Sequence, residues 1–285
     1  MKGRSFKEIT AMRSFGLLFI GLMGYAVASI GCASYQRSII YQPPHFAAER
    51  VQNSARAAGF ERWSNTLGQP IGIKRPSLTQ PARGCVLITY GNASWSVGCA
   101  RYADDLQQIA ALDVFVLEYP GYADRAGSPS QKNILQAANE ALQTLGTNGP
   151  VYLIGESLGS AVATYLAGTQ PDRVSGVILL SPFNRLTSLA RYHMPMLPAG
   201  LILVDRYAPQ DYLRDYHGAV GIMVDGRDEV VPEKFGQRLY DSYSGPKKLW
   251  RFPEGSHISI MKPPLKFWSE VLDFWQNNHL ASQPS

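Results

Sequence analysis

The chain has 285 residues, 45% of them hydrophobic. This content supports a buried core and excludes a disordered chain, and the length suits one large α/β domain or two small ones. The net charge of +5 is concentrated at the N-terminus, where four basic residues and one acid give residues 1–31 a charge of +3 and leave +2 for the remainder. Because no basic stripe is left over, composition does not favour a nucleic-acid-binding protein.

Residues 1–31 are predicted to be a targeting segment. A basic head ends at Arg13, and Phe15 to Ile30 is uncharged and mostly apolar, which is typical of a secretory signal peptide. Ser29-Ile30-Gly31-Cys32 resembles a bacterial lipoprotein cleavage box, with Ser29 where leucine is usual. That resemblance implies lipidation of Cys32, which would become the new N-terminus.

Two alternatives stay open for this segment. Phe15–Ser34 has about the 20 residues that span a bilayer, and the positive charge before it would keep the N-terminus of such an anchor in the cytoplasm. A cleaved signal with a soluble body is the other alternative. A lipoprotein and an uncleaved anchor both predict that the rest of the chain lies outside the cytoplasm and is tethered to a membrane, on the periplasmic side in a bacterium. Residues 32–59 are predicted to be a linker wrapped against the body, because the prolines of Tyr41-Gln42-Pro43-Pro44 oppose regular structure.

Over residues 60–280, strand-like apolar runs alternate with helical patterns. An antiparallel pair is predicted at 60–66 and 72–75, and buried strands are predicted at 85–90, 114–118, 151–154, 174–180, 219–224 and 247–252. Helices are predicted at 99–111, 130–145, 161–167, 232–243 and 264–278, the last with Phe267, Trp268, Val271, Leu272 and Trp275 on one face. This alternation predicts an α/β fold with a mostly parallel sheet covered on both faces.

Gly155-Glu156-Ser157-Leu158-Gly159 fits the G-x-S-x-G pattern of a nucleophile elbow. A strand pattern precedes it and a helical composition follows it, so a sharp turn is predicted to hold the Ser157 hydroxyl at the edge of the sheet. The flanking glycines leave room for a strained serine backbone. The N–H of Leu158, at the N-terminus of the following helix, is predicted to donate to an oxyanion.

Candidate partners for this serine follow two later strands. Asp228 comes shortly after the predicted strand 219–224, and His257 shortly after 247–252. Both are therefore expected at the carboxyl ends of parallel strands, where the ligand sites of open α/β sheets gather. Asp225 is a second candidate acid. The order Ser, Asp, His is the order found in α/β-hydrolases.

The chain resembles an α/β-hydrolase over nearly all of residues 40–278. It is most similar to the membrane-tethered serine hydrolases that include the mammalian protein depalmitoylases and many small bacterial lipoproteins. The likeness is carried by Tyr90-Gly91-Asn92-Ala93, Tyr119-Pro120-Gly121-Tyr122 with Ser128-Pro129-Ser130, the elbow Gly155–Gly159, and the loops Asp228–Pro232 and Gly255–His257. Two positions depart from it: Tyr90 stands where the family has histidine, and Asp225 where relatives often have histidine.

The resemblance implies an α/β-hydrolase fold with a short cap insert at about 184–217, and acyl transfer as the chemistry. Ser157 would attack a carbonyl while His257 takes its proton, and Asp228 would orient and stabilise the imidazole. The N–H groups of Asn92 and Leu158 would hold the oxyanion, each contributing roughly 3–4 kcal/mol. No metal or cofactor is implied.

The predicted function is a serine hydrolase for carboxylic esters or thioesters, with a small-molecule or acyl ester as substrate. A serine peptidase or amidase on the same triad is an alternative, but the cap sequence shows no dedicated charged cluster for a peptide end. A non-catalytic envelope lipoprotein is a third, which Ser157, Asp228 and His257 argue against.

Two smaller predictions concern apolar side chains. The apolar side chains of the cap are predicted either to line an acyl site or to pack onto the domain. They are Met194, Met196, Leu197, Leu201, Ile202, Leu203 and Val204. The predicted compartment permits a disulfide between Cys85 and Cys99, but two separate buried thiols are the favoured prediction.

Overall fold

The computed structural model describes residues 35–146, 149–196, 199–257 and 262–281. The chain divides into two compact units, Met1–Ile40 and Tyr41–Ser285. In the first unit, residues 35–40 are helical, and the Ser38 hydroxyl donates to the Tyr35 carbonyl at 2.8 Å. The predicted signal or anchor and Cys32 lie outside the described residues. Within the described part of the chain, no helix is both long and apolar enough to cross a membrane.

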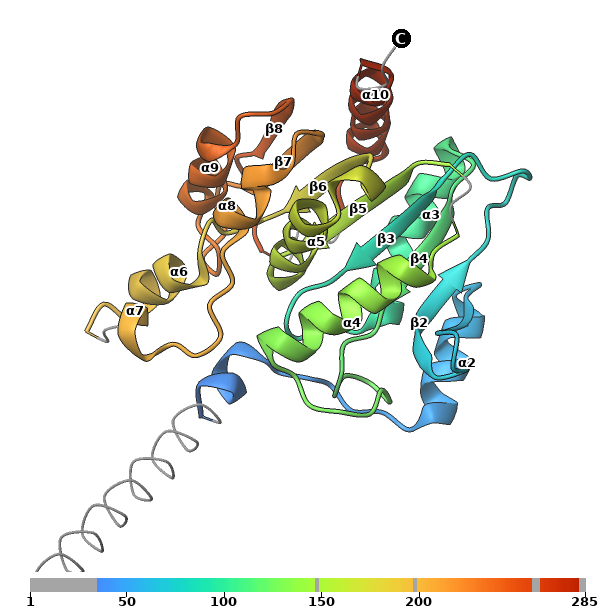
Figure 1. Cartoon of the computed structure of the whole chain (residues 1–285), viewed down its shortest axis with the longest axis horizontal. Helices are drawn as coiled ribbons and strands as arrows, with labels where there is room; N and C mark the ends of the chain where they lie inside the picture. Colours follow the sequence, from blue (N-terminus) through green and yellow to red (C-terminus); the bar gives the residue numbers. More distant parts are fainter. Residues whose placement is uncertain (1–34, 147–148, 197–198, 258–261, 282–285) are drawn as a thin grey trace, which may run out of the picture. The chain divides into compact units, whose positions relative to one another are not determined.

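The second unit is built on an eight-stranded sheet in the order β1-β2-β4-β3-β5-β6-β7-β8 (Figure 1). Its strands are β1 (Glu61–Ser64), β2 (Pro70–Arg75), β3 (Cys85–Thr89), β4 (Asp113–Leu117), β5 (Val151–Glu156), β6 (Gly176–Leu180), β7 (Ala219–Asp225) and β8 (Lys247–Phe252). The pairs β1–β2 and β2–β4 are antiparallel, and the remaining neighbours are parallel. The predicted antiparallel opening pair and mostly parallel sheet are confirmed.

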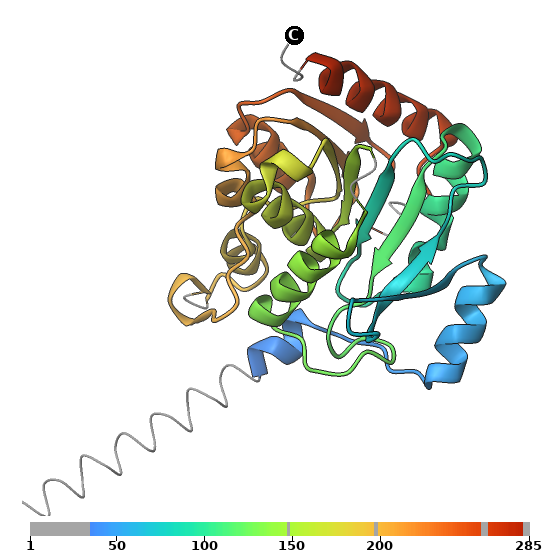
Figure 2. The ribbon, with the colours of Figure 1, turned by 45° about the vertical axis from the view of Figure 1, so that its right-hand side comes forward.

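Helices cover both faces of the sheet, with α4 and α5 on one face and α3 and α10 on the other (Figures 1 and 2). The helices are α2 (Ala48–Ala57), α3 (Ala100–Ile109), α4 (Gln131–Thr144), α5 (Leu158–Thr169), α6 (Leu186–His193), α7 (Ala199–Ile202), α8 (Pro209–Tyr212), α9 (Glu233–Ser242) and α10 (Leu265–Ala281). Short 3₁₀ helices are η1 (Ser96–Cys99), η2 (Pro171–Arg173) and η3 (Leu213–Asp215).

The core lies between the sheet and these helix layers. Every residue of β3, β5, β6 and β7 is buried, as expected for continuous apolar strands covered on both faces. The predicted apolar face of α10 is buried too, and its Trp275 stacks on Tyr152 of β5 with ring centroids 4.5 Å apart. Trp268, on the same face, meets Tyr102 of α3 edge to face.

The strand order creates a switch point at β3. The next strand along the chain, β4, lies on one side of β3, and β5 lies on the other. The connections leaving β3 and β5 therefore run to different parts of the sheet, and ligand sites of open α/β sheets lie beyond the carboxyl ends of the strands at such a point. The loop after β3 and the elbow after β5 both begin at these carboxyl ends.

The region predicted to be a linker, residues 32–59, contains an unpredicted helix, α2. In α2, Val51 and Ala55 are buried, and Tyr41 ahead of it is only 2% exposed. His45 forms a parallel bridge with Ala123, so this stretch is built into the second unit. The linker prediction rested on Pro43 and Pro44, which oppose helix only in their own neighbourhood, and α2 begins four residues after Pro44.

Candidate functional site

Ser157 occupies a strained turn between β5 and α5. Its φ of 51° and ψ of −114° are unfavourable for a side-chain-bearing residue, and such strain costs on the order of 1–3 kcal/mol. The glycines on either side allow the turn: a Cβ on Gly155 would lie 2.6 Å from Ser160 Cα, and one on Gly159 would overlap the Thr89 carbonyl. The Ser157 N–H donates to the Leu180 carbonyl at 2.9 Å, which fixes the turn against β6.

Asp228 and His257 meet across the loops that follow β7 and β8. The His257 Nδ1 lies 2.7 Å from Asp228 Oδ2, and the Asp228 side chain is fully buried while that of His257 is 26% exposed. The other carboxylate oxygen, Oδ1, accepts the N–H groups of Val230 at 2.9 Å and Val231 at 2.7 Å. Three donors therefore surround the carboxylate, so its position and that of the imidazole are tightly defined.

The two loops are also joined through their backbones. The N–H of Gly226 donates to the Phe252 carbonyl at 2.9 Å, and that of Arg227 donates to the Gly255 carbonyl at 2.8 Å. These bonds continue the parallel pairing of β7 with β8, which ends at Asp225 and Phe252. The sheet thus brings together two side chains that are 29 positions apart in the sequence.

The loop after β3 lies against the elbow. A Cβ on Gly91 would stand 3.5 Å from Ser157 Cβ, so the Gly91 backbone is next to the serine, and Asn92 is the residue that follows it. Leu158, the other predicted oxyanion donor, is the first residue of α5. Backbone N–H groups at a helix N-terminus and in an adjacent loop are a suitable pair of donors for an anionic oxygen.

The comparisons with known proteins agree with this architecture. A family model described as alpha/beta hydrolase fold matches residues 84–221. The uncharacterized protein Rv2307c of Mycobacterium tuberculosis is 30% identical over 233 residues, covering 79% of this chain and 81% of its own. An uncharacterized membrane protein of Saccharomyces cerevisiae, YNL320W, is 30% identical over 172 residues, covering 57% of this chain and 60% of its own.

Solved structures show the same fold. The Pyrococcus furiosus esterase Pf2001 matches with a TM-score of 0.62 and 14% identity, covering 84% of this chain and 97% of its own. The chain belongs to the alpha/beta-hydrolase family. The family match supports a hydrolase enzyme.

In this hydrolase the second candidate acid, Asp225, lies beneath the histidine loop. The Ser181 hydroxyl donates to Asp225 Oδ2 at 3.3 Å. A Cβ on Gly255 would overlap Asp225 Oδ1, so the side chain is packed directly against the loop that carries His257. The acid bonded to the imidazole is Asp228, and Asp225 supports the loop from below.

Tyr90, the departure from the family's histidine, is fully buried at the end of β3. Its hydroxyl donates to Glu118 Oε1, and its carbonyl accepts the Tyr119 hydroxyl at 2.9 Å. Glu118 belongs to none of the sequence motifs described above. Its one sequence signal is a carboxylate at the end of an apolar run, because a charge that is buried there needs several hydrogen-bond donors.

The cap insert of the hydrolase holds α6, α7, α8 and η3. Of the apolar side chains predicted there to line an acyl site or to pack, Leu203 is buried, whereas Met196, Ile202 and Val204 are 93%, 38% and 51% exposed. The side chains of Leu197 and Leu201 lie outside the described residues. A contact from His193 Nε2 to the Val230 carbonyl, 2.8 Å long, links the end of α6 to the loop of Asp228.

A cavity of about 270 Å³ lies beside the histidine loop. It is lined by Met223, Asp225, Phe252, Pro253, Glu254, Gly255, Lys262, Pro263 and Pro264. Ser157 does not line it, so we do not assign it to the substrate.

The two thiols predicted to be separate and buried are free cysteines in the structure, and the prediction is confirmed. Burial raises the pKa of Cys85 to about 12 and that of Cys99 well above its usual value. Neither thiol is therefore suited to act as a nucleophile near neutral pH.

Proposed function

We propose that this hydrolase cleaves carboxylic esters or thioesters with Ser157 as nucleophile, His257 as general base and Asp228 as the acid that orients it. The observation that carries the proposal is the 2.7 Å bond between His257 Nδ1 and the fully buried Asp228. This bond leaves the other imidazole nitrogen for a proton transfer. The strained turn at Ser157 supports the same assignment.

In the proposed reaction, Ser157 Oγ attacks the carbonyl carbon and His257 Nε2 takes the hydroxyl proton. The carbonyl oxygen becomes an oxyanion that the N–H groups of Leu158 and Asn92 stabilise. Collapse of the tetrahedral species breaks the bond to the leaving alcohol or thiol, which receives the proton from His257. Water then attacks the acyl-enzyme by the same steps, which releases the acid and restores Ser157.

We further propose that the protein is held at a membrane, outside the cytoplasm, through its N-terminal segment. The basic head and the apolar stretch up to Cys32 support this placement. The yeast relative named as a membrane protein is consistent with it.

Active-site labelling tests the proposed nucleophile. A fluorophosphonate probe should label the wild-type protein, and Ser157→Ala should abolish labelling. Ser269→Ala, the same change on α10, is the matched control and should label normally. Equal labelling of Ser157→Ala and wild type would refute the assignment.

Substrate class is tested with p-nitrophenyl esters of graded chain length beside aminoacyl anilides. Turnover of the esters that depends on Ser157 is the expected result. Preferential turnover of the anilides would make the protein an amidase or peptidase, and no turnover together with no labelling would make it a non-catalytic member of the fold.

A further inference from the structure

One carboxylate holds both ends of the loop that follows β3. Glu118 comes directly after β4, and its Oε1 accepts the hydroxyl of Tyr90, the residue before the loop. Its Oε2 accepts both the N–H and the hydroxyl of Ser96, the first residue of η1, at 3.2 and 2.7 Å. The intervening residues, Gly91–Trp95, include the backbone that lies against Ser157.

All three groups of this cluster are buried: Tyr90 and Ser96 are 0% exposed and Glu118 is 2% exposed. A buried carboxylate is costly unless donors compensate for the lost water. Three donors suit the oxygens of Glu118, which only accept once the carboxyl is ionised. Burial and the charge of Glu118 raise the pKa of Tyr90 well above its usual range, so the phenol keeps its proton and remains a donor. The cluster therefore fixes the positions of Tyr90 and Ser96.

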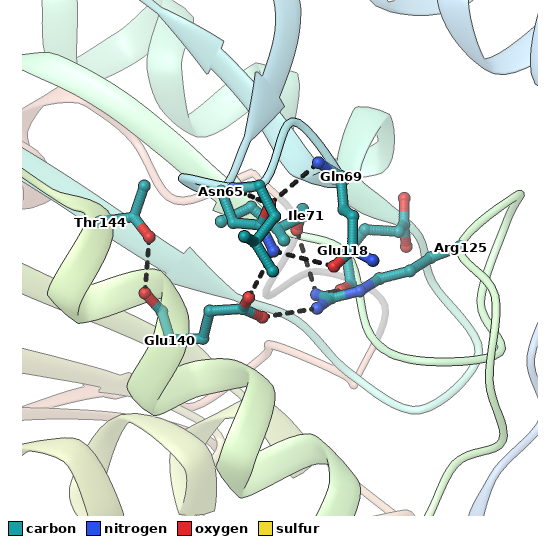
Figure 3. Close-up of polar contacts among 8 residues, drawn as sticks. Asn65, Gln69, Ile71, Glu118, Arg125, Glu140 and Thr144 are labelled. Atoms are coloured by element: carbon teal, nitrogen blue, oxygen red, sulfur yellow. Dashed lines mark hydrogen bonds and ion pairs between the residues drawn. The ribbon is translucent and has the colours of Figure 1, made fainter.

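The backbone of Glu118 is itself anchored. Its N–H donates to the Ile71 carbonyl at 2.9 Å, and its carbonyl accepts Arg125 Nη1 at 2.6 Å. Arg125 also pairs with Glu140 of α4 at 3.2 Å, and Figure 3 shows these contacts side by side. The carboxylate thus extends from a main chain that is bonded to β2 and, through Arg125, to α4.

Within the loop, the Ser94 N–H donates to the Gly91 carbonyl at 3.3 Å. Tyr90 is fixed a second time by Tyr119, whose N–H donates to the Tyr90 hydroxyl at 3.1 Å. The contacts to Glu118 and Tyr119 therefore tie the loop to the end of β4.

We propose that Glu118 is a positioning residue for the oxyanion site: through Tyr90 and Ser96 it holds the Gly91–Trp95 loop, and hence the Asn92 N–H, in place beside Ser157. This inference rests on the proposed function. Tyr90, which stands where the family has histidine, fixes the loop by its bond to Glu118.

Kinetics of three conservative variants test this role. Tyr90→Phe, Ser96→Ala and Glu118→Gln each weaken the cluster without adding bulk. Each should lower kcat for a p-nitrophenyl ester and the rate of fluorophosphonate labelling by about 10- to 100-fold. This loss is smaller than the roughly 10²- to 10³-fold fall in kcat that follows removal of a whole oxyanion donor, because the donor is displaced and not removed. KM should change little, because the loop acts on the transition state.

A double-mutant cycle separates positioning from general weakening of the fold. In the Glu118→Gln background, Tyr90→Phe and Ser96→Ala should each cost less than they cost alone, because they act through the same carboxylate. Asn65→Ala is the control: it breaks the bond to Glu140, 2.6 Å long, in the neighbouring polar network and should leave kcat unchanged. If Glu118→Gln does not fold, the other two variants decide the question alone.

Wild-type kcat in folded Tyr90→Phe and Ser96→Ala would overturn the inference, and so would additive effects in the cycle. These results are distinct from failure of the proposed function, which shows as labelling that survives Ser157→Ala. Labelling that depends on Ser157 but has the same rate in all cluster variants would refute the positioning role alone.

Discussion

The buried carboxylate of Glu118 should make stability fall as pH rises toward neutrality. Burial raises its pKa from 4.5 to about 7, against the hydrogen bonds from Ser96 and Tyr90, which lower it, and the nearby charge of Asp124 raises it slightly. The guanidinium of Arg125 binds the backbone carbonyl of the same residue. Between about pH 4.5 and 7 the folded state therefore holds more protons than the unfolded state, and the free energy of unfolding decreases with pH in that window.

The magnitude follows from the two pKa values. A difference of about 2.5 in pKa corresponds to about 3 kcal/mol in total, and about 2 kcal/mol of it is lost between roughly pH 5 and 7.5. For a domain of this size that loss lowers Tm by roughly 4–8 °C. Glu118→Gln cannot titrate, so this part of the pH dependence should be missing from the variant.

Urea unfolding followed by tryptophan fluorescence, at about pH 5 and 7.5, measures the effect as the difference between wild type and Glu118→Gln. Glu49→Gln, which removes an exposed carboxylate on α2, controls for the change in net charge. The reasoning fails if wild type and Glu118→Gln lose the same free energy of unfolding between the two pH values. It also fails if Glu49→Gln removes as much of the pH dependence.

Three further predictions concern other parts of the chain. Asp228→Asn should lower kcat by about 10⁴, whereas Asp225→Asn should act mainly on stability; steady-state kinetics showing the reverse would move the acid role to Asp225. Gly159→Ala places a methyl group against the Thr89 carbonyl and should destabilise the protein by about 1–3 kcal/mol while slowing fluorophosphonate labelling, so an unchanged Tm would contradict the close approach. Stable membrane binding needs about two acyl chains, which a lipidated Cys32 would carry. Cys32→Ser should therefore remove a lipid adduct from the mass of the intact protein in the membrane fraction; a wild-type protein that retains Met1 and has no adduct would contradict lipidation.

The sequence by itself predicted the sheet and the elbow, because both depend on local signals. Continuous apolar runs such as Cys85–Thr89 identify buried strands, and the periodic face of Leu265–Ala281 identifies the closing helix. Glycines at positions 155 and 159 are required by the turn around Ser157, whatever the rest of the chain does. The side-chain pattern of α2 was too polar to be recognised in the same way.

Tertiary structure decided which polar groups are partners. Asp225 and Asp228 are both acids just past one strand, and only the joined loops after β7 and β8 show that the imidazole bonds to Asp228. Glu118 and Tyr90 meet because β4 and β3 are parallel neighbours, although 28 positions separate them in the sequence. A buried polar group must find donors wherever the strand order places them, so its partners depend on the whole sheet and not on the residues beside it.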